Sequence, residues 1–122
     1  MNKILVIDDE VNIIKAVSMY LEGHHYEVVS VLEGLEGINE AKNFLPDLIL
    51  LDLILPDMDG FLVCQALKSN ITTNDIPVVV MSAKSQECDK VKAKECGAID
   101  YIVKPFKPEM LIETIQKHIK EN

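Results

Sequence analysis

The sequence has 122 residues, of which 48% are hydrophobic, and this size and composition suit one domain with one apolar core. Its formal net charge is −8, from 20 acidic residues against 12 lysines and no arginine, which argues against DNA or RNA as a direct ligand because proteins that bind them show a basic face. It has no apolar run of about 18 residues that would cross a membrane. We therefore expect a cytoplasmic domain over residues 1–122 that makes no direct contact with nucleic acid or membrane.

Short apolar runs alternate five times with longer stretches of helical period, which is the pattern of βα units around a parallel sheet. In chain order the predicted elements are a strand at 3–7, a helix at 10–22, a strand at 26–31, a helix at 35–43, a strand at 48–52, a helix at 60–68, a strand at 77–81, a helix at 85–96, a strand at 100–103 and a helix at 108–120. Segment 26–31 alternates like an edge strand, whereas segment 48–52 is almost continuously apolar, like a central one. The sequence therefore predicts a doubly wound (βα)5 α/β fold with strand order 2-1-3-4-5.

Residues that commonly begin helices stand where helices are predicted to start, and these are Asp59 or Gly60, Ser85 and Pro108. Gly23 and Gly97 follow predicted helices, so we expect both as left-handed C-caps. The cysteines Cys64, Cys88 and Cys96 have no metal-ligand or disulfide spacing. We expect the histidines to lie at the surface, and these are His24, His25 and His118.

Four of the apolar runs end in polar residues suited to handling a phosphoryl group. These residues are Asp8 with Asp9, Asp52, Ser82 and Lys104. The carboxyl ends of parallel strands meet at one edge of a sheet, where α/β proteins bind their ligands. The sequence therefore predicts one site that combines three carboxylates, a hydroxyl and an ammonium group.

This predicted site is short of positive charge. Two carboxylates about 4 Å apart repel each other by roughly 4 kcal/mol at an effective dielectric constant near 20, and Lys104 supplies a single compensating charge. Oxygen ligands with room for water favour Mg²⁺, with Mn²⁺ as the second choice. With such an ion bound, a carboxylate can act as the nucleophile and form an aspartyl phosphate. Asp52 is the best candidate because it ends the most apolar strand.

The motifs, in their order and spacing, resemble the response-regulator receiver domain of two-component signalling, the CheY-like family. The segments that carry this resemblance are Asp8-Asp9, Leu51 to Gly60, Ser82-Ala83 and Tyr101 to Phe106. The resemblance covers essentially the full length of the chain. It implies a flavodoxin-like fold and a phosphoacceptor rather than an enzyme, with only self-directed phosphoryl transfer and slow autodephosphorylation.

The resemblance also implies a role for each residue of the site. Asp52 would accept the phosphoryl group from the phosphohistidine of a partner. Asp9 and Asp52 would hold Mg²⁺ directly, together with the backbone carbonyl of Ile54, whereas Asp8 would act mainly through water. Lys104 would contact the phosphoryl oxygens.

Two further residues would form the switch of such a domain. Ser82 would swing in to hydrogen-bond the phosphoryl oxygens, and Tyr101 would follow it inward. This movement would change the surface formed by the helix at 85–96, the strand at 100–103 and the helix at 108–120. The changed surface would signal to a downstream effector protein or domain.

Residues beside the site carry further expectations. The family commonly has a cis bond before the proline that follows its lysine, so we predict a cis Lys104–Pro105 bond, although few X-Pro bonds in folded proteins are cis. Ile54 and Lys84 flank the path along which water would attack the phosphoryl group. Because an apolar Ile54 cannot orient that water, we expect slow self-dephosphorylation unless a partner assists.

The first predicted helix carries two apolar lines. A core-facing line is predicted at Val11, Ile14, Ser18 and Leu21, and a second line at Ile13, Ala16 and Tyr20. In receivers the first helix binds a sensor histidine kinase or a histidine phosphotransfer protein. We therefore expect such a partner to dock near Ile13, Pro105 and Phe106, although the second line is equally well explained by a deeply buried helix.

Two rival functions remain open on the sequence alone. One is an aspartate-nucleophile phosphatase like the haloacid dehalogenases, with Asp57 and Asp59 as its DxD pair, but Pro56 precedes the pair where that family has a strand. The other is a degenerate receiver that binds partners without phosphate, which would usually lack one of the acidic or lysine positions. The chain is expected to be either a free-standing receiver or part of a longer regulator. A phosphorylation-dependent dimer also stays open, although the absence of arginine removes one common kind of dimer contact.

Overall fold

The computed structural model describes residues 2–119, in which strands and helices alternate along the chain. The elements are β1 (Lys3–Ile7), α1 (Val11–Gly23), β2 (Glu27–Val31), α2 (Gly34–Phe44), β3 (Leu48–Asp52), α3 (Gly60–Ser69), β4 (Val78–Ser82), α4 (Glu87–Glu95), β5 (Asp100–Val103) and α5 (Pro108–His118). Every predicted element is present, and no end within the described residues is displaced by more than two residues. The last predicted helix extended to residue 120, which lies outside the described residues. None of the helices within 2–119 is long and apolar enough to cross a bilayer.

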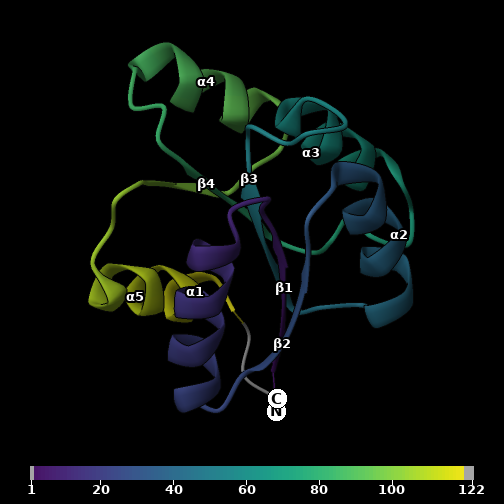
Figure 1. Ribbon diagram of the computed structural model, residues 1–122. Coiled ribbons are helices and arrows are strands. Elements are labelled where there is room, and N and C mark those ends of the chain that lie inside the picture. Colours follow the sequence, from purple (N-terminus) through teal and green to yellow (C-terminus); the bar gives the residue numbers. More distant parts are fainter. Residues whose placement is uncertain (1, 120–122) are drawn as a thin grey trace.

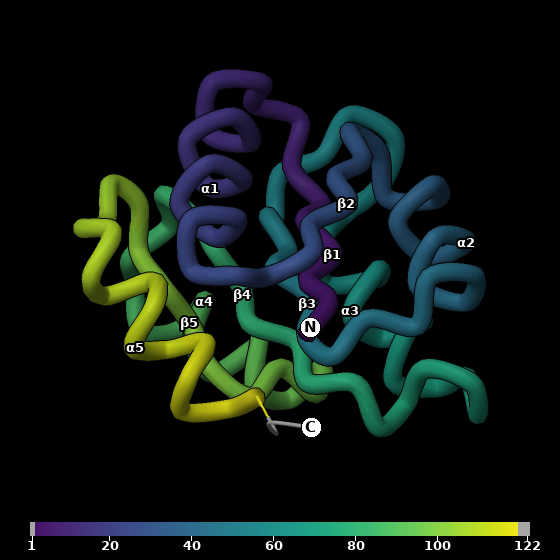
Figure 2. The backbone as a smooth tube through the Cα atoms, turned by 90° about the horizontal axis from the view of Figure 1, so that it is seen from below, coloured from purple at the N-terminus to yellow at the C-terminus, as the bar shows by residue number. Residues whose placement is uncertain are grey.

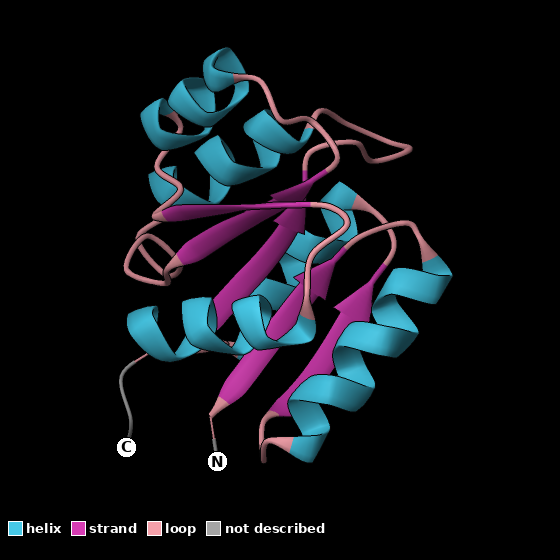
Figure 3. Cartoon of the chain, turned by 90° about the vertical axis from the view of Figure 1, so that its left-hand side faces the viewer, coloured by secondary structure: helices cyan, strands magenta, loops and turns pink. Residues whose placement is uncertain are grey.

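The five strands form one parallel sheet in the order β2-β1-β3-β4-β5, which confirms the predicted topology. Helices α1 and α5 cover one face of this sheet, and α2, α3 and α4 cover the other (Figures 1 and 2). The strands run toward the same edge of the sheet, as Figure 3 shows and their parallel pairing requires. The loops that follow the strands therefore gather at that edge, which is where the sequence predicts a site.

The sheet is buried on both faces because successive strand residues point to opposite sides. In β1, Ile4 and Val6 pack under α1 and α5, whereas Leu5 and Ile7 pack under α2 and α3. The same alternation holds in β3 and β4, where every residue is buried. Burying each such aliphatic side chain contributes about 1.5–3 kcal/mol, so the apolar runs hold the strand ends at fixed positions.

Helix α1 buries a different line of residues from the predicted one. Ile14 and Leu21 lie in the core as expected, but Val17 takes the place that was predicted for Ser18, and Val11 is about half exposed. Residues three and four apart share a helix face, so the sequence allowed either line. The structure selects the line that buries the larger apolar side chain.

Several predicted helix caps are confirmed and others are wrong. The Asp59 carboxylate accepts a hydrogen bond from the backbone N–H of Phe61 at 2.8 Å, and Pro108 begins α5, as predicted. Gly97 adopts a left-handed φ of 104°, also as predicted. Ser85 does not cap α4, whose N-cap is Gln86. Gly23 is the last residue of α1, and the left-handed conformation falls two residues later, at His25.

Not every predicted surface side chain lies at the surface. The His118 side chain is 13% exposed, and its Nε2 atom lies 2.8 Å from Oδ2 of Asp100, so this pair joins the end of α5 to the start of β5. The prediction that His118 sits at the surface is therefore wrong. All three cysteines are free thiols, in agreement with the prediction.

Replacing Gly60 with alanine is expected to destabilise the fold by about 1–3 kcal/mol, the range typical of overpacking. A Cβ atom at Gly60 would lie 2.4 Å from Cα of Leu53 and 2.6 Å from the carbonyl oxygen of Asp52, and neither backbone atom can move freely. Gly23→Ala is the matched control, because nothing lies within 4 Å of its Cβ position. Urea unfolding of both variants measures the difference, and equal stability of the two would contradict the close approach.

Candidate functional site

The structure brings the four predicted strand ends together. The sheet register pairs Ile7 with Leu51 and Asp52 with Met81, so Asp8, Asp52 and Ser82 follow or end neighbouring strands at similar heights. All three side chains are deeply buried, with exposed fractions of 0%, 4% and 0%. These polar groups therefore lie at the edge of the apolar sheet but are largely withdrawn from water.

Lys104 lies at the centre of the site. Its Nζ atom is 2.7 Å from Oδ2 of Asp8, 3.2 Å from Oδ2 of Asp52 and 3.0 Å from Oε1 of Glu10. The Lys104 side chain is only 8% exposed. Its backbone N–H donates to the carbonyl of Ser82 at 2.8 Å, which extends the β4–β5 ladder beyond the end of β5. This backbone hydrogen bond thus fixes the position of Lys104, whose side chain contacts the carboxylates.

The pKa values of Lys104 and Asp52 report how crowded this site is. Burial lowers the pKa of Lys104, but hydrogen bonds to Asp8 and Glu10 and the charge of Asp52 outweigh it and hold the pKa above its usual range. Burial, followed by the charge of Asp8, raises the pKa of Asp52 to about 6. Lys104 and the backbone N–H of Ile54, which lies 3.3 Å from Oδ1 of Asp52, oppose that rise. A single ammonium group thus leaves part of the carboxylate repulsion uncompensated.

The acidic cluster differs in one member from the predicted metal ligands. Among residues 2–119, the acidic side chains that could share one ion are Asp8, Glu10 and Asp52, whose oxygens lie within 4.8 Å of one another. Glu10 was not predicted as a member of the site, because a third consecutive acidic residue at the start of a helix is usually exposed to solvent. Asp9 is exposed and is not part of this group. The ligand roles of Asp9 and of the Ile54 carbonyl stay predictions.

This donor set suits a small hard cation. Carboxylate oxygens are the ligands that Mg²⁺ and Mn²⁺ prefer, and such ions usually bind through one or two carboxylates while keeping several waters. Two buried carboxylates and one exposed carboxylate against one ammonium leave the group net negative. The residues present therefore fit a divalent cation.

The two predicted switch residues both contact the loop between β4 and α4. The Oγ atom of Ser82 accepts a hydrogen bond from the backbone N–H of Lys84 at 3.1 Å. The hydroxyl of Tyr101 donates to the backbone carbonyl of Lys84 at 2.8 Å. Lys84 is thus held by both side chains, which links the end of β4 to the surface of β5.

An apolar cavity of about 170 Å³ lies between α1 and the segment that follows β5. The three predicted docking residues all line it, and its lining consists of Ile13, Ala16, Val17, Tyr20, Lys104, Pro105, Phe106, Pro108 and Leu111. The Lys104–Pro105 bond is cis, as predicted. The second apolar line of α1 is therefore neither fully buried nor fully exposed, because it forms one wall of a groove beside the site.

The DxD pair of the rival phosphatase has structural roles. The two carboxylate oxygens of Asp57 accept hydrogen bonds from the backbone N–H groups of Gly34 and Leu35 at 2.7 and 2.9 Å, and these bonds lower the pKa of Asp57. Asp57 thus caps the start of α2, while Asp59 caps α3. With both carboxylates engaged by helix starts, this pair is poorly suited to act as a nucleophile and its acid.

A flavodoxin-like sheet whose carboxyl edge gathers carboxylates around one lysine defines an α/β domain that handles phosphoryl groups. The model of the response regulator receiver domain family matches residues 4–116, and the chain belongs to this family. It is a receiver domain of two-component signalling, a phosphoacceptor module and not a conventional enzyme.

Individual proteins support the same assignment. The chain is 42% identical over 116 residues to the DNA-binding dual master transcriptional regulator RpaA of Synechocystis, covering 95% of this chain and 48% of RpaA. The chemotaxis protein CheY4 of Vibrio cholerae has a similar structure, with a TM-score of 0.93, 31% identity and coverage of 98% of this chain and 99% of CheY4. The receiver domain of the sensor histidine kinase PA1611 from Pseudomonas aeruginosa, solved with magnesium in its active site cleft, has a TM-score of 0.89, 25% identity and coverage of 96% of each chain. The chain spans about half the length of the curated relatives it matches.

The Asp52→Asn variant is expected to be more stable than the wild-type chain at pH 7 without divalent cations. The pKa of Asp52 rises from 3.8 to about 6 on folding, so above that pH the folded chain holds a carboxylate whose charge opposes folding. A rise of about 2 in the pKa on folding lowers the free energy of unfolding at pH 7 by about 2–3 kcal/mol.

The sign of this effect follows from proton linkage. A raised pKa means that the folded chain binds more protons than the unfolded one between about pH 4 and 6, so stability falls as pH increases through that window. The advantage of Asp52→Asn should therefore be nearly absent at pH 4 and complete above pH 6. Urea unfolding across this range measures it, and an advantage independent of pH would refute this electrostatic explanation.

Proposed function

We propose that Asp52 is the residue of this receiver that becomes phosphorylated, within a domain covering residues 1–122. The observation that carries the proposal is the position of its carboxylate, buried at the carboxyl edge of the central strand and 3.2 Å from the Lys104 ammonium. An oxygen of Asp52 attacks the phosphorus of a partner's phosphohistidine. The P–N bond breaks, and its electron pair returns to the imidazole nitrogen, which takes up a proton.

The other residues of the site position and neutralise the incoming group. Lys104 contacts the phosphoryl oxygens, and Ser82 donates its hydroxyl hydrogen to one of them. Asp9, Asp52 and the backbone carbonyl of Ile54 would hold Mg²⁺ directly, or Mn²⁺ in its place, as the family leads us to expect, and Asp8 would act mainly through water. When bound, the ion supplies the positive charge that draws the phosphoryl group to a carboxylate.

Phosphorylation then changes the surface of the domain that an effector binds. When Ser82 turns toward the phosphoryl group, it gives up its contact with the Lys84 backbone, and Tyr101 adjusts with the same loop. The surface of α4, β5 and α5 changes as a result. An effector protein or domain binds this surface, and any phosphorylation-dependent dimer would use it too. The acidic charge of the chain argues that nucleic acid is not its direct ligand.

Incubation with acetyl phosphate and Mg²⁺ tests the proposal by intact mass. A single phosphoryl adduct is expected on the wild-type chain and none on Asp52→Asn or after chelation of the metal. Decay of the adduct once the donor is removed should be slow, because the exposed Ile54 side chain beside Asp52 offers no group that could orient a hydrolytic water. No adduct on the folded wild-type chain would favour the degenerate module, and steady release of phosphate from added esters would favour the phosphatase.

The proposed partner is a sensor histidine kinase or histidine phosphotransfer protein of the cytoplasm, docked at the groove formed by Ile13, Pro105 and Phe106. Ile13→Asp places a charge in this groove and should slow phosphoryl transfer from the cognate partner at least about tenfold, equivalent to 1.4 kcal/mol. Transfer from acetyl phosphate, which needs no docking surface, should be unchanged. Met19→Asp is the matched control, because Met19 is exposed on the same helix and does not line the groove. Equal transfer to both variants would contradict docking at this groove.

A further inference from the structure

Glu10 lies over the Lys104 ammonium, on the solvent side of the site. Its Oε1 atom lies 3.0 Å from Nζ of Lys104, and its side chain is 56% exposed, against 8% for Lys104. The backbone N–H of Glu10 donates to Oδ1 of Asp8 at 2.9 Å, which fixes the start of the side chain beside the site. Glu10 thus lies between the buried ammonium and the solvent.

The hydrogen-bonding capacity of Lys104 is fully used in this arrangement. A lysine ammonium has three N–H donors. Its three neighbours are oxygens of Asp8, Asp52 and Glu10, at 2.7, 3.2 and 3.0 Å. A phosphoryl oxygen can therefore gain a bond from Lys104 only if one of these carboxylates gives its bond up.

The three carboxylates differ in what release would cost. Asp8 is completely buried, and a buried carboxylate that loses its cation is strongly destabilised. Asp52 is the proposed acceptor, so it is no longer a carboxylate once phosphorylated, but it keeps a carbonyl oxygen that can accept from Lys104. The Glu10 carboxylate is more than half exposed and can return to water. Exposed ion pairs contribute at most about 1 kcal/mol. Of the two carboxylates that phosphorylation leaves unmodified, Glu10 is therefore the one that Lys104 can release more easily.

We infer that Glu10 is a positioning residue that competes with the phosphoryl group for Lys104. In the resting domain it occupies the donor that the phosphoryl oxygen needs, and it turns to solvent when that group arrives. Glu10 thereby weakens binding of the phosphoryl group and sets how readily the domain enters its phosphorylated state. This inference rests on the proposed phosphoacceptor function.

Binding of beryllofluoride, which mimics a phosphoryl group on a carboxylate, tests the inference at equilibrium. Its affinity is measured by fluorine NMR or calorimetry at a Mg²⁺ concentration that saturates each variant. Glu10→Gln should bind it more tightly than the wild-type chain, by between about twofold and fivefold, the range expected for loss of one exposed ion pair. Glu10→Asp keeps the charge but shortens the side chain, so it should show most of the same gain.

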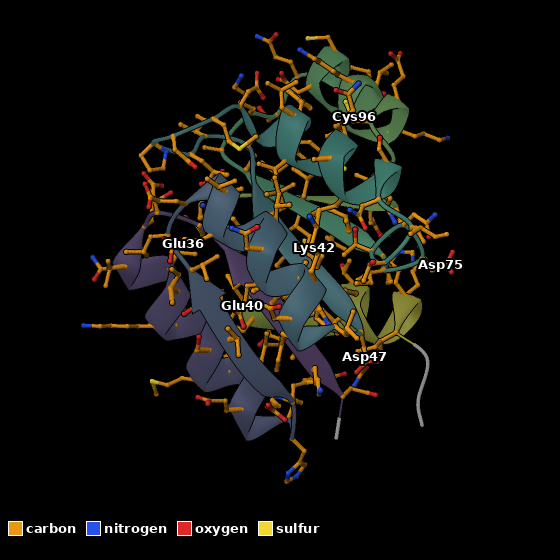
Figure 4. All side chains as sticks on the ribbon, turned by 90° about the vertical axis from the view of Figure 1, so that its right-hand side faces the viewer. Glu36, Glu40, Lys42, Asp47, Asp75 and Cys96 are labelled. Carbon is orange, nitrogen blue, oxygen red and sulfur yellow. The ribbon has the colours of Figure 1, made fainter. Side chains whose placement is uncertain are left out.

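Two controls separate this contact from a general effect of charge. Glu36→Gln removes the same charge from the exposed first turn of α2 (Figure 4), and its affinity should equal that of the wild-type chain. A gain in Glu36→Gln equal to that in Glu10→Gln, or wild-type affinity in Glu10→Asp, would overturn the inference. So would unchanged or weaker binding by Glu10→Gln, as expected if Glu10 served as a metal ligand. Failure of the wild-type chain to bind beryllofluoride would overturn the proposed function as well.

Discussion

One buried ammonium group shared by three carboxylates is the constraint on which the site depends. Lys104 bridges Asp8, Asp52 and Glu10, yet the pKa of Asp52 is still raised to about 6 by burial and by Asp8. A site with unrelieved negative charge attracts a divalent cation, and the cation in turn allows a phosphoryl group to approach a carboxylate. The feature that makes the resting pocket costly thus also makes it able to accept phosphate.

The sheet is what keeps this costly arrangement in place. Helices on both faces bury the strands completely in β3 and β4, so a shift of register would move every apolar side chain out of its layer. The strand ends cannot move apart to relieve repulsion between Asp8 and Asp52. The loops beyond them are tied down as well, since Asp57 caps α2 and Tyr101 holds the carbonyl of Lys84. Apolar packing thus supplies the free energy that holds polar groups at close range.

Features set by the pattern of strands and helices could be predicted from the sequence, whereas features set by single side-chain contacts between distant residues could not. The strand order and the meeting of Asp8, Asp52, Ser82 and Lys104 were predictable, because alternating βα units and buried strands leave few alternatives. The position of the Glu10 side chain was not predictable, because it depends on a contact with Lys104, which follows β5, and sequence spacing carries no such information. Burial of Val17 instead of Ser18 depends on packing of helix α1. The left-handed conformation at His25 instead of Gly23 depends on local backbone geometry at the end of that helix.

Calorimetric titration of Mg²⁺ into the metal-free chain, combined with urea unfolding at pH 7, tests the central claim most directly. If carboxylate repulsion governs the site, the ion should bind at one site and stabilise the fold by about 2.7 kcal/mol at a concentration 100 times its dissociation constant. Binding should weaken strongly in Asp52→Asn, which lacks one carboxylate. A chain that binds no Mg²⁺, or that binds it equally well with Asp52→Asn, would contradict the account.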